Sequence, residues 1–467
     1  IYFDKKAIIQ TEYRQKNKSN DHIIDFSLLS NMQGENNSKT HFFSNSNFNL
    51  GLSAFDYSQL KINIEQTSHD TYLKTYNINS PIINNTSTLN SSLEISAYRE
   101  DMELELSAEI LEDLSKTQND RYEYIFPNFN FTKDLNLDSN IDGSLTFRSS
   151  GHRKLYKTNV HEDILVNDLL YTSSPRLSSK GIMSDYKILI KNFNSDAKNS
   201  SEYKTNFDSN LMTQLIFDNK FPLIKKNKGQ INYFTPKISL RYSPNKTRNL
   251  ADEDRRIEYS NIFSLNRLSS ENTVEGGESI TAGFEYKKIN NQNLEFLKFN
   301  IASSFRHEKD LDVPLNSTLG KKSSDLFGNL FFKPNEIFNF DYNYAIDNSL
   351  DTVNYHHVKS DIVINNFVTG FEFLERSDEA TNESFLKNSI GYRFDETNGI
   401  KYETRKNKLT DSTEYYSLIY EYKNDCLTAA IEYNKNYYTD DDLRPSEDIF
   451  FKLTIIPFGE ARSPNLN

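Results

Sequence analysis

Histidine and cysteine are the side chains of this sequence best suited to catalysis or metal binding. The chain has 467 residues with 8 His and 1 Cys, and no histidine stands in an HExxH or other spaced metal motif. His356 and His357 are adjacent, and adjacent residues of a strand point to opposite faces, so they would not meet at one site. GxSxG, P-loop and GxGxxG motifs are missing as well. We therefore predict no catalytic residue, no cofactor and no metal, and that the protein is not an enzyme.

The single cysteine, Cys426, follows a polar turn and opens an alternating segment. Leu427, Ala429 and Ile431 share one parity of this segment, whereas Cys426 shares the other with Glu432. An unpaired cysteine in an exported protein, where thiols oxidise, suggests a disulfide to another chain or segment. The alternative is a small inert side chain in a packed interior. Because Cys426 lies at a polar position beside a turn, we favour the pairing role.

Composition excludes several classes of protein. The net charge is -12, the mean hydropathy is -0.70 and hydrophobic residues make up 36%, which is low for one large packed core. Aromatic residues reach 13%, more than is typical of a disordered chain. No run approaches the about 18 apolar residues that a membrane-spanning helix needs. Both charge signs are spread along the chain, which argues against nucleic acid as a partner because phosphate contacts need clustered Lys and Arg.

Alternation of apolar and polar residues is the dominant pattern. In Met102–Ile110 (MELELSAEI) apolar residues occupy every second position, with Glu or Ser between them. In Phe338–Asp347 (FNFDYNYAID) large apolar residues alternate mainly with Asn and Asp. Side chains of a strand alternate between two faces, so each segment is predicted to be a strand with one apolar and one polar side. Roughly 22 to 24 such segments, each about 8 to 12 residues long, follow one another with short polar connections.

Two all-β architectures fit this pattern. A soluble sandwich or solenoid would bury the apolar faces against another layer, and a transmembrane barrel would turn them to lipid around a polar interior. The number of segments, the lack of a domain linker, the charges on the polar faces and the Tyr and Phe residues at strand ends favour the barrel. We therefore predict one large antiparallel transmembrane β-barrel domain over residues 1–467, in the bacterial outer membrane. The polar residues predicted to face its lumen are Glu103, Glu105, Glu109, Asp142, Arg148, Lys298, Arg306, Asp341 and Glu432.

Three longer polar stretches interrupt the alternation. They are Ser149–Asn159, Asn245–Glu258 and Lys309–Ser324. In outer-membrane barrels the longer connections are extracellular and the short turns are periplasmic. We therefore predict three extracellular loops at these positions.

The most specific motifs of the sequence lie in Thr235–Asn245, Ser260–Tyr286 and Ile419–Glu460. These stretches resemble the LptD family of lipopolysaccharide-assembly proteins. The C-terminal block Ile419–Glu460 is similar to the family's last strand pair, with Cys at the turn, a loop containing Asp, Arg and Pro, and a final strand that ends in Pro-Phe-Gly. Thr235–Asn245 and Ser260–Tyr286 resemble the family's central strand and the Glu-Gly-Gly run that follows it. Shorter stretches agree in order along the chain: Ile8–Gln15, His69–Ile78 and Tyr122–Phe131.

The resemblance implies a barrel of about 26 strands that follows an N-terminal periplasmic jellyroll. Nothing in this sequence corresponds to the jellyroll or to the first barrel strands, so we expect the chain to be an N-terminally truncated barrel. By the same resemblance, Cys426 would pair with a cysteine of the jellyroll, outside this sequence.

The resemblance also implies a function in lipopolysaccharide assembly. A barrel of this family receives lipopolysaccharide from the periplasmic Lpt bridge, by way of the N-terminal domain, and releases it into the outer leaflet through a seam between its first and last strands. The partners expected here are lipopolysaccharide, an LptE-like lipoprotein plug, the Lpt bridge, the barrel-assembly machinery and outer-membrane lipid. The rival predictions are a general porin or TonB-type receptor, and a soluble adhesin or β-repeat protein.

The predicted last strand, Ile449–Phe458, would form one side of this seam. Pro457 lacks a backbone N–H near its end, which is typical of an edge strand. The apolar residues of such a strand can also signal insertion by the assembly machinery, and both roles can hold together. The predicted seam residues are Ile449, Phe451, Leu453, Ile455, Pro457 and Phe458.

Overall fold

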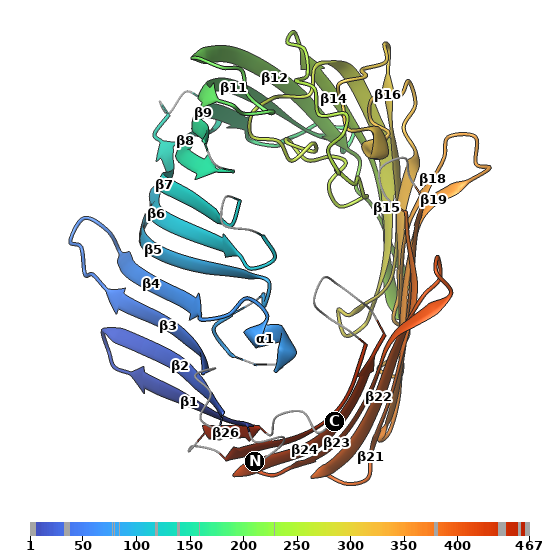
Figure 1. Cartoon of the computed structure of the whole chain (residues 1–467). Coiled ribbons are helices and arrows are strands. Elements are labelled where there is room, and N and C mark those ends of the chain that lie inside the picture. The colour runs from blue at the N-terminus through green and yellow to red at the C-terminus, as the bar shows by residue number, and fades with distance from the viewer. Residues whose placement is uncertain are drawn as a thin grey trace.

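Strands that follow one another in the chain lie side by side and run antiparallel. The computed structural model contains one 26-stranded sheet that curls around a central space, with a short helix on its inner side (Figure 1). The structure describes residues 6–31, 38–76, 78, 80–83, 85–116, 120–137, 141–157, 159–227, 229–377, 382–437, 445–455 and 459–462.

The strands have the following bounds: β1 Lys6–Lys16, β2 Asn20–Asn31, β3 Lys39–Asn49, β4 Tyr57–Thr67, β5 Thr88–Arg99, β6 Met102–Asp113, β7 Tyr122–Leu135, β8 Gly143–Tyr156, β9 Val160–Ser173, β10 Arg176–Leu177, β11 Met183–Lys198, β12 Asp208–Lys220, β13 Leu223–Asn227, β14 Gln230–Ser243, β15 Gly277–Asn290, β16 Glu295–Arg306, β17 Leu326–Phe332, β18 Phe338–Ile346, β19 Val353–Ile364, β20 Phe367–Ser377, β21 Asn382–Arg393, β22 Asn398–Asn407, β23 Ser412–Lys423, β24 Leu427–Asn436, β25 Ser446–Ile455 and β26 Gly459–Arg462. The helices are α1 (Tyr72–Thr75) and a 3-10 helix, η1 (Leu315–Ser317). No helix in the described part of the chain has the length and apolar content needed to cross a membrane.

The alternating pattern explains why these segments form one wall. Between β5 and β6, Ile95 lies opposite Leu106 and Ser96 lies opposite Glu105. Apolar side chains therefore share one face over neighbouring strands, and polar side chains share the other. The short turn between β19 and β20 contains Asn365 with a φ of 50°, a left-handed conformation that asparagine tolerates. Turns of this kind allow each strand to reverse directly onto its neighbour.

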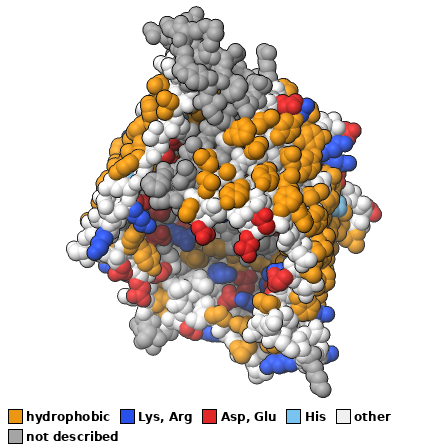
Figure 2. Space-filling model, turned by 90° about the horizontal axis from the view of Figure 1, so that it is seen from below, with side chains coloured by type: hydrophobic (Ala, Val, Ile, Leu, Met, Phe, Trp, Pro, Cys, Tyr) orange, Lys and Arg blue, Asp and Glu red, His pale blue; other side chains and the backbone are white. Residues whose placement is uncertain are grey.

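The apolar face is the outer surface of the curled sheet. Leu106, Leu215 and Phe451 lie within paired strands, yet 40%, 41% and 46% of their surfaces are exposed. Figure 2 views the side that lies at the bottom of Figure 1 and shows hydrophobic side chains gathered in broad areas of the outer wall, with charged side chains around a hollowed region. An apolar surface of this extent is suited to contact with lipid rather than with water.

The predicted antiparallel wall is confirmed. Of the 26 strands in the described sheet, β10, β13 and β26 have 2, 5 and 4 residues and are too short to show alternation, and without these three the number falls within the roughly 22 to 24 predicted. The strands differ from the prediction in two details. Most of Ser149–Asn159 is not a loop, because its register with β9 continues to Tyr156 in β8. Ile449–Phe458 is not the last strand, because β26 follows β25 and pairs with it.

Two long connections, which contain Asn245–Glu258 and Lys309–Ser324, fold back inside the barrel from one of its ends. That this end is extracellular stays a prediction. We call residues 244–276, between β14 and β15, the long inner loop. We call residues 307–325, between β16 and β17, the second inner loop. Figure 1 shows chain from this part of the molecule within the ring of strands.

Apolar side chains explain why the two loops fold inward. Leu250 of the long inner loop and Val313 of the second inner loop are 2% and 1% exposed, and both share a core cluster with Phe327 of β17. A separate core cluster joins Phe43 of β3 to Tyr72 of α1. Each cluster removes apolar surface from water, at about 25 cal/mol per Å². The lumen is therefore not uniformly polar, and its apolar parts hold segments of the chain against the wall.

Candidate functional site

The inner wall at β6 and β7 carries three of the glutamates predicted to face the lumen. Asn130 Nδ2 donates to Glu105 Oε2 at 3.4 Å, and Asn128 Nδ2 donates to Glu109 Oε1 at 3.2 Å. Glu103 lies two residues from Glu105, on the same face of β6. These side chains form a continuous polar surface that suits water or hydroxyl groups.

Other predicted lumen residues are distributed around the wall. Arg148 of β8 stands opposite Asp168 of β9 in the strand register. Asp341 of β18 stands opposite Lys359 of β19. Lys298 of β16 stands opposite Lys287 of β15. None of the other predicted lumen residues is its partner in the strand register of the described residues. Charges of both signs are distributed along the wall instead of forming one centre.

The next two predicted lumen residues lie in the middle of a strand and in a turn. Glu432 of β24 accepts a hydrogen bond from Asn434 Nδ2 at 2.7 Å. Asp142 lies in the turn before β8 rather than in the strand, and its carbonyl oxygen accepts a hydrogen bond from the Tyr171 hydroxyl at 2.6 Å. Of the predicted lumen residues, Arg306 alone enters a buried ionic cluster in the described part of the chain.

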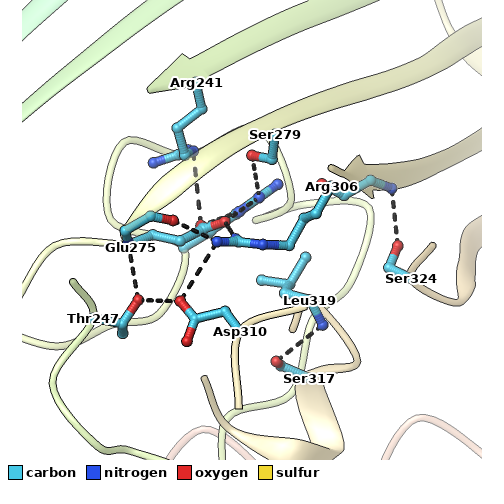
Figure 3. A network of polar contacts seen from close by, with 12 residues as sticks. Arg241, Thr247, Glu275, Ser279, Arg306, Asp310, Ser317, Leu319 and Ser324 are labelled. Carbon is cyan, nitrogen blue, oxygen red and sulfur yellow. Dashed lines mark hydrogen bonds and ion pairs between the residues drawn. The ribbon is translucent and has the colours of Figure 1, made fainter. Parts of the chain in front are cut away.

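Arg306 is one of three arginines that surround Glu275 (Figure 3). Arg306 Nη1 donates to Glu275 Oε1 at 2.6 Å. Arg267 donates through Nε and Nη2 to the two oxygens of the same carboxylate, both at 2.6 Å. Arg241 Nε lies 3.8 Å from Glu275 Oε2. We call these four residues the Glu275 cluster.

The Glu275 cluster is buried and ionised. The four side chains are between 1% and 4% exposed. Burial by itself would raise the pKa of Glu275, but Arg267, Arg241 and Arg306 together outweigh burial and hold that pKa at about 2. The Glu275 carboxylate is the negative charge shared by the three buried guanidinium groups. Its loss would therefore leave positive charges buried without their partner.

The Glu275 cluster joins both inner loops to the wall. Glu275 belongs to the long inner loop, and Arg306 ends β16, where the second inner loop begins. Arg306 Nη2 lies 3.5 Å from Asp310 Oδ2. The hydroxyl of Thr247 donates to the same Asp310 oxygen at 2.5 Å and accepts from the Gly276 N–H at 2.9 Å. These contacts fix the two loops to each other and to the barrel.

Glu275 and Arg267 were not predicted as site residues, although both lie in the Ser260–Tyr286 block. Charged residues in a loop are normally solvated, so residue type alone did not separate them from their neighbours. The usable signal was the Glu-Gly-Gly run. A Cβ on Gly276 would lie 2.4 Å from the Asn245 carbonyl oxygen, so this close approach of two backbone segments requires glycine.

A second buried polar network holds α1 against β2 and β3. Ser27 Oγ lies 2.6 Å from His41 Nδ1 and 2.8 Å from the Tyr72 hydroxyl. His41 Nε2 lies 3.3 Å from Asp25 Oδ1, and Gln10 Nε2 of β1 donates to both Asp25 oxygens at 3.0 Å. Ser27, His41 and Asp25 are at most 1% exposed, so no substrate can reach them. The network links β1 to the inner helix and has a structural role.

The remaining histidine pair is split between the two faces of β19. The Tyr342 hydroxyl lies 2.9 Å from His356 Nδ1, and His357 Nε2 lies 2.8 Å from Glu372 Oε1. Within the described ranges, no group of three His, Cys, Asp or Glu side chains has a geometry that could hold a metal ion.

Within the described residues, the first and last strands of the sheet do not pair with each other. Among the residues that the structure describes, no backbone pairing joins β1 to β25 or β26, whereas the long strands between these ends pair with both neighbours. The curl of the sheet brings its N-terminal and C-terminal strands to the same side of the ring (Figure 1). We call this unpaired junction the seam. Ile9 and Tyr13 of β1 are 66% and 53% exposed beside it.

Three of the predicted seam residues can be placed with their side chains. Ile449, Phe451 and Leu453 of β25 are 38%, 46% and 38% exposed and share the outward parity of Ile431 in β24. The side chain of Ile455, and Pro457 and Phe458 as a whole, lie outside the described residues.

Cys426 lies in the exposed turn between β23 and β24 and is a free thiol. Its backbone N–H donates to Asn424 Oδ1 at 2.9 Å. Because the chain has 1 Cys, no disulfide can form within it. The turn belongs to the end of the barrel with the shorter connections, opposite the end from which the two inner loops fold inward.

A curled antiparallel sheet with an apolar exterior and a polar, partly filled interior defines an outer-membrane β-barrel. Within that class the chain belongs to the LptD family, described as LPS transport system D, whose family model matches residues 36–369. Members of this family are transport and assembly barrels rather than enzymes, so the chain acts in lipopolysaccharide assembly at the outer membrane, with lipopolysaccharide as substrate. The match contains the central block Thr235–Tyr286 and ends before Ile419–Glu460.

Solved barrels of other families are only distantly similar to the chain. The siderophore receptor PirA from Acinetobacter baumannii aligns with a TM-score of 0.38 at 8% identity, over 95% of this chain and 80% of the receptor. The siderophore receptor PirA from Pseudomonas aeruginosa aligns with a TM-score of 0.35 at 8% identity, over 99% of this chain and 80% of the receptor. A mutant porin of Rh. blastica aligns with a TM-score of 0.24 at 8% identity, covering 67% of this chain and 91% of the porin. No curated protein matches the chain.

Proposed function

We propose that the barrel releases lipopolysaccharide into the outer leaflet through the seam between β1 and β25–β26. The transported molecule has an apolar lipid part and a polar saccharide part, so its two parts need different surroundings as it moves. A wall whose backbone groups are all paired would have to lose hydrogen bonds in hydrocarbon to let the lipid part pass sideways, at several kcal/mol for each unsatisfied group.

The observation that carries this proposal is the absence of pairing between β1 and β25 or β26 in the described part of the chain. In the described part of the chain, opening at this junction would break no backbone hydrogen bonds between strands. Opening between β8 and β9 would separate two strands that pair over 14 residue pairs. The seam is therefore the junction at which lateral passage disrupts the wall least.

The polar inner wall supports the second half of the route. Glu105 and Glu109, with the asparagines that contact them, offer hydrogen bonds to hydrated saccharide groups. The Glu275 cluster keeps the two inner loops fixed to β14 and β16, so the loops would not obstruct the seam by moving freely. In this route the saccharides cross the lumen while the lipid part leaves through the wall.

Family membership supports the further partners as part of the same proposal. They are the periplasmic Lpt bridge acting through an N-terminal domain, an LptE-like lipoprotein within the lumen, the barrel-assembly machinery and outer-membrane lipid. The exposed Cys426 turn lies at the end with the shorter connections, which is periplasmic in outer-membrane barrels. We propose that Cys426 forms a disulfide there with a cysteine outside this sequence.

Photo-crosslinking in growing cells tests the route. Ile9→p-benzoylphenylalanine and Phe451→p-benzoylphenylalanine place a probe at the seam, and Leu215→p-benzoylphenylalanine places one on the outer face of β12, which is 41% exposed. The proposal predicts lipopolysaccharide adducts at the two seam positions and only background at Leu215. Equal adduct yields at all three positions would contradict it.

A further inference from the structure

A small cavity lies in the barrel interior, between the wall of β8–β14 and residues 265–275 of the long inner loop. Its volume is about 100 Å³. One water molecule needs about 10–15 Å³ of such space, whereas sites for drug-sized molecules have about 300–1,000 Å³. The cavity therefore has room for a small ion or a few waters, but not for a whole sugar ring or a lipid chain.

Arg148 and Lys191 supply positive charge on the wall side of this cavity. In the strand register, Arg148 of β8 stands opposite Asp168 of β9, and Asp168 stands opposite Lys191 of β11. The Lys191 side chain is 6% exposed, and its Nζ lies 2.8 Å from Asp168 Oδ1. Arg148 is exposed and forms no ion pair with any described residue. Asp168 therefore compensates Lys191 and leaves the charge of Arg148 without a bound carboxylate.

The loop side of the cavity is formed by part of the Glu275 cluster. The charged residues of the whole lining are the cations Arg148, Lys191, Arg241 and Arg267 and the carboxylates Asp168 and Glu275. Arg306, the remaining member of the cluster, is matched by Asp310 at 3.5 Å. Asp185 and Asp218 lie 3.8 and 2.7 Å from Lys187 of β11 and do not line the cavity.

The lining therefore has four cations for two carboxylates, although the chain as a whole has a net charge of -12. An excess of positive charge in a largely enclosed space is unfavourable unless an anion compensates it. The composition of the lining thus favours a negatively charged occupant over a neutral one.

Arg241 has hydrogen-bond donors that remain available beside the cavity. A guanidinium group has five N–H donors. Arg241 Nη1 and Nη2 donate to the carbonyl oxygens of Leu265 and Ser264, both at 2.6 Å, and each nitrogen carries a second hydrogen. Arg241 Nε lies 3.8 Å from Glu275 Oε2 (Figure 3), which is too long for a hydrogen bond. Arg241 can therefore donate to a further acceptor.

We infer that this cavity binds a small oxyanion of phosphate chemistry, held by Arg148, Lys191 and Arg241. The N–H groups of a guanidinium match two oxygens of a phosphate at once, and an ammonium adds a compact positive charge. A bound phosphate would offset the excess charge of the lining. It would also strengthen the attachment of the long inner loop to the wall, because Arg241 of β14 already holds two carbonyl oxygens of that loop. Its binding does not depend on the route of release, so the site goes beyond the proposed function.

Isothermal titration calorimetry with inorganic phosphate, on the intact chain in detergent micelles, tests this site. Sodium gluconate keeps the ionic strength constant, so that a general salt effect does not appear as binding. The variant is Arg148→Gln, which removes one cation of the lining from an exposed position. The matched control is Arg153→Gln, because Arg153 lies on the other face of the same strand, pairs with Asp163 and does not line the cavity. Heat-modifiable mobility on gels checks that both variants are folded.

The wild type is expected to bind phosphate saturably. Arg148→Gln is expected to bind it about 10- to 100-fold more weakly, as for the loss of a charge-assisted hydrogen bond, and Arg153→Gln to bind it like the wild type. No saturable binding by the wild type, or equal affinity in the wild type and Arg148→Gln, would overturn the inference.

A parallel titration with glucose 1-phosphate distinguishes two sources of the phosphate group. Binding of inorganic phosphate alone would indicate a free ion, because the cavity cannot hold the sugar ring as well. Binding of both compounds, each weakened in Arg148→Gln, would indicate that the phosphate group of a larger molecule can enter from the lumen. Either result supports the phosphate site.

Discussion

Arg267 and Glu275, both on the long inner loop, form a buried two-contact ion pair with both N–O distances at 2.6 Å. The same carboxylate also receives Arg306 from the end of β16, 31 residues further along the chain. One side chain therefore connects the loop to itself and to the barrel wall. This arrangement makes Glu275 the residue on which the position of the inner loops depends most.

Glu275→Gln is predicted to destabilise the barrel by about 3–5 kcal/mol, because it leaves buried guanidinium groups without their carboxylate. The measurement is the thermal transition in detergent, followed by heat-modifiable mobility on gels. Glu278→Gln, three residues away and exposed, is the control and should change little. A Glu275→Gln barrel that melts with the wild type would show that the cluster does not hold the loops.

The same cluster predicts an acid-sensitive part of the stability. The pKa of Glu275 is lowered from 4.5 to about 2 on folding, so its contribution is complete above pH 4.5 and is lost as the pH falls from there towards 2. The difference in unfolding free energy between the wild type and Glu275→Gln should stay constant from pH 7 to pH 5 and shrink below pH 4.5. A difference that stayed constant down to pH 2.5 would contradict the lowered pKa.

The assignment of the two faces predicts opposite responses at adjacent positions of β6. Leu106 is 40% exposed on the outer face. The substitution Leu106→Lys would place a positive charge in lipid there, which raises the free energy of the inserted barrel by about 2–4 kcal/mol near the middle of the membrane. Glu105→Lys changes only a lumen side chain and should assemble normally. Fractionation of outer membranes and heat-modifiable mobility measure assembly. Normal assembly of Leu106→Lys beside failure of Glu105→Lys would reverse the faces.

The proposed disulfide predicts that the thiol of Cys426 becomes unreactive when its partner cysteine is present. In this chain by itself the thiol is exposed and free, so a maleimide reagent should label it fully under native conditions. In cells that also supply the proposed partner cysteine, labelling should appear only after reduction, because the proposed disulfide would protect the thiol. Labelling without reduction in those cells would rule out the disulfide, and Cys426→Ser gives the background of the assay.

The alternating segments made the wall predictable from sequence. In Met102–Ile110 and Phe338–Asp347 each side chain meets one of two solvents, so residue type follows position with a period of two. That local pattern is sufficient to define strands and their faces. It cannot define β10 or β26, which have 2 and 4 residues and take their conformation from the neighbouring strand.

The interior was less predictable because its contacts join distant parts of the chain. Asn245–Glu258 is polar in composition, yet Leu250 is 2% exposed against residues of the second inner loop. Arg241 and Arg306 look like ordinary lumen residues until Glu275 is placed between them. A single sequence shows which residues are charged, but the pairing that buries them depends on the folded path of two loops.

Covalent closure of the seam tests the central claim most directly. In a Cys426→Ser background, Ile9→Cys with Phe451→Cys can be joined across the seam by a flexible bis-maleimide. The control pair, Ile9→Cys with Leu28→Cys, joins residues that already face each other in the β1–β2 register. The measured quantity is newly made lipopolysaccharide that reaches the cell surface. The account predicts that delivery stops when the seam is joined and continues when the control pair is joined; unchanged delivery through a fully joined seam would contradict it.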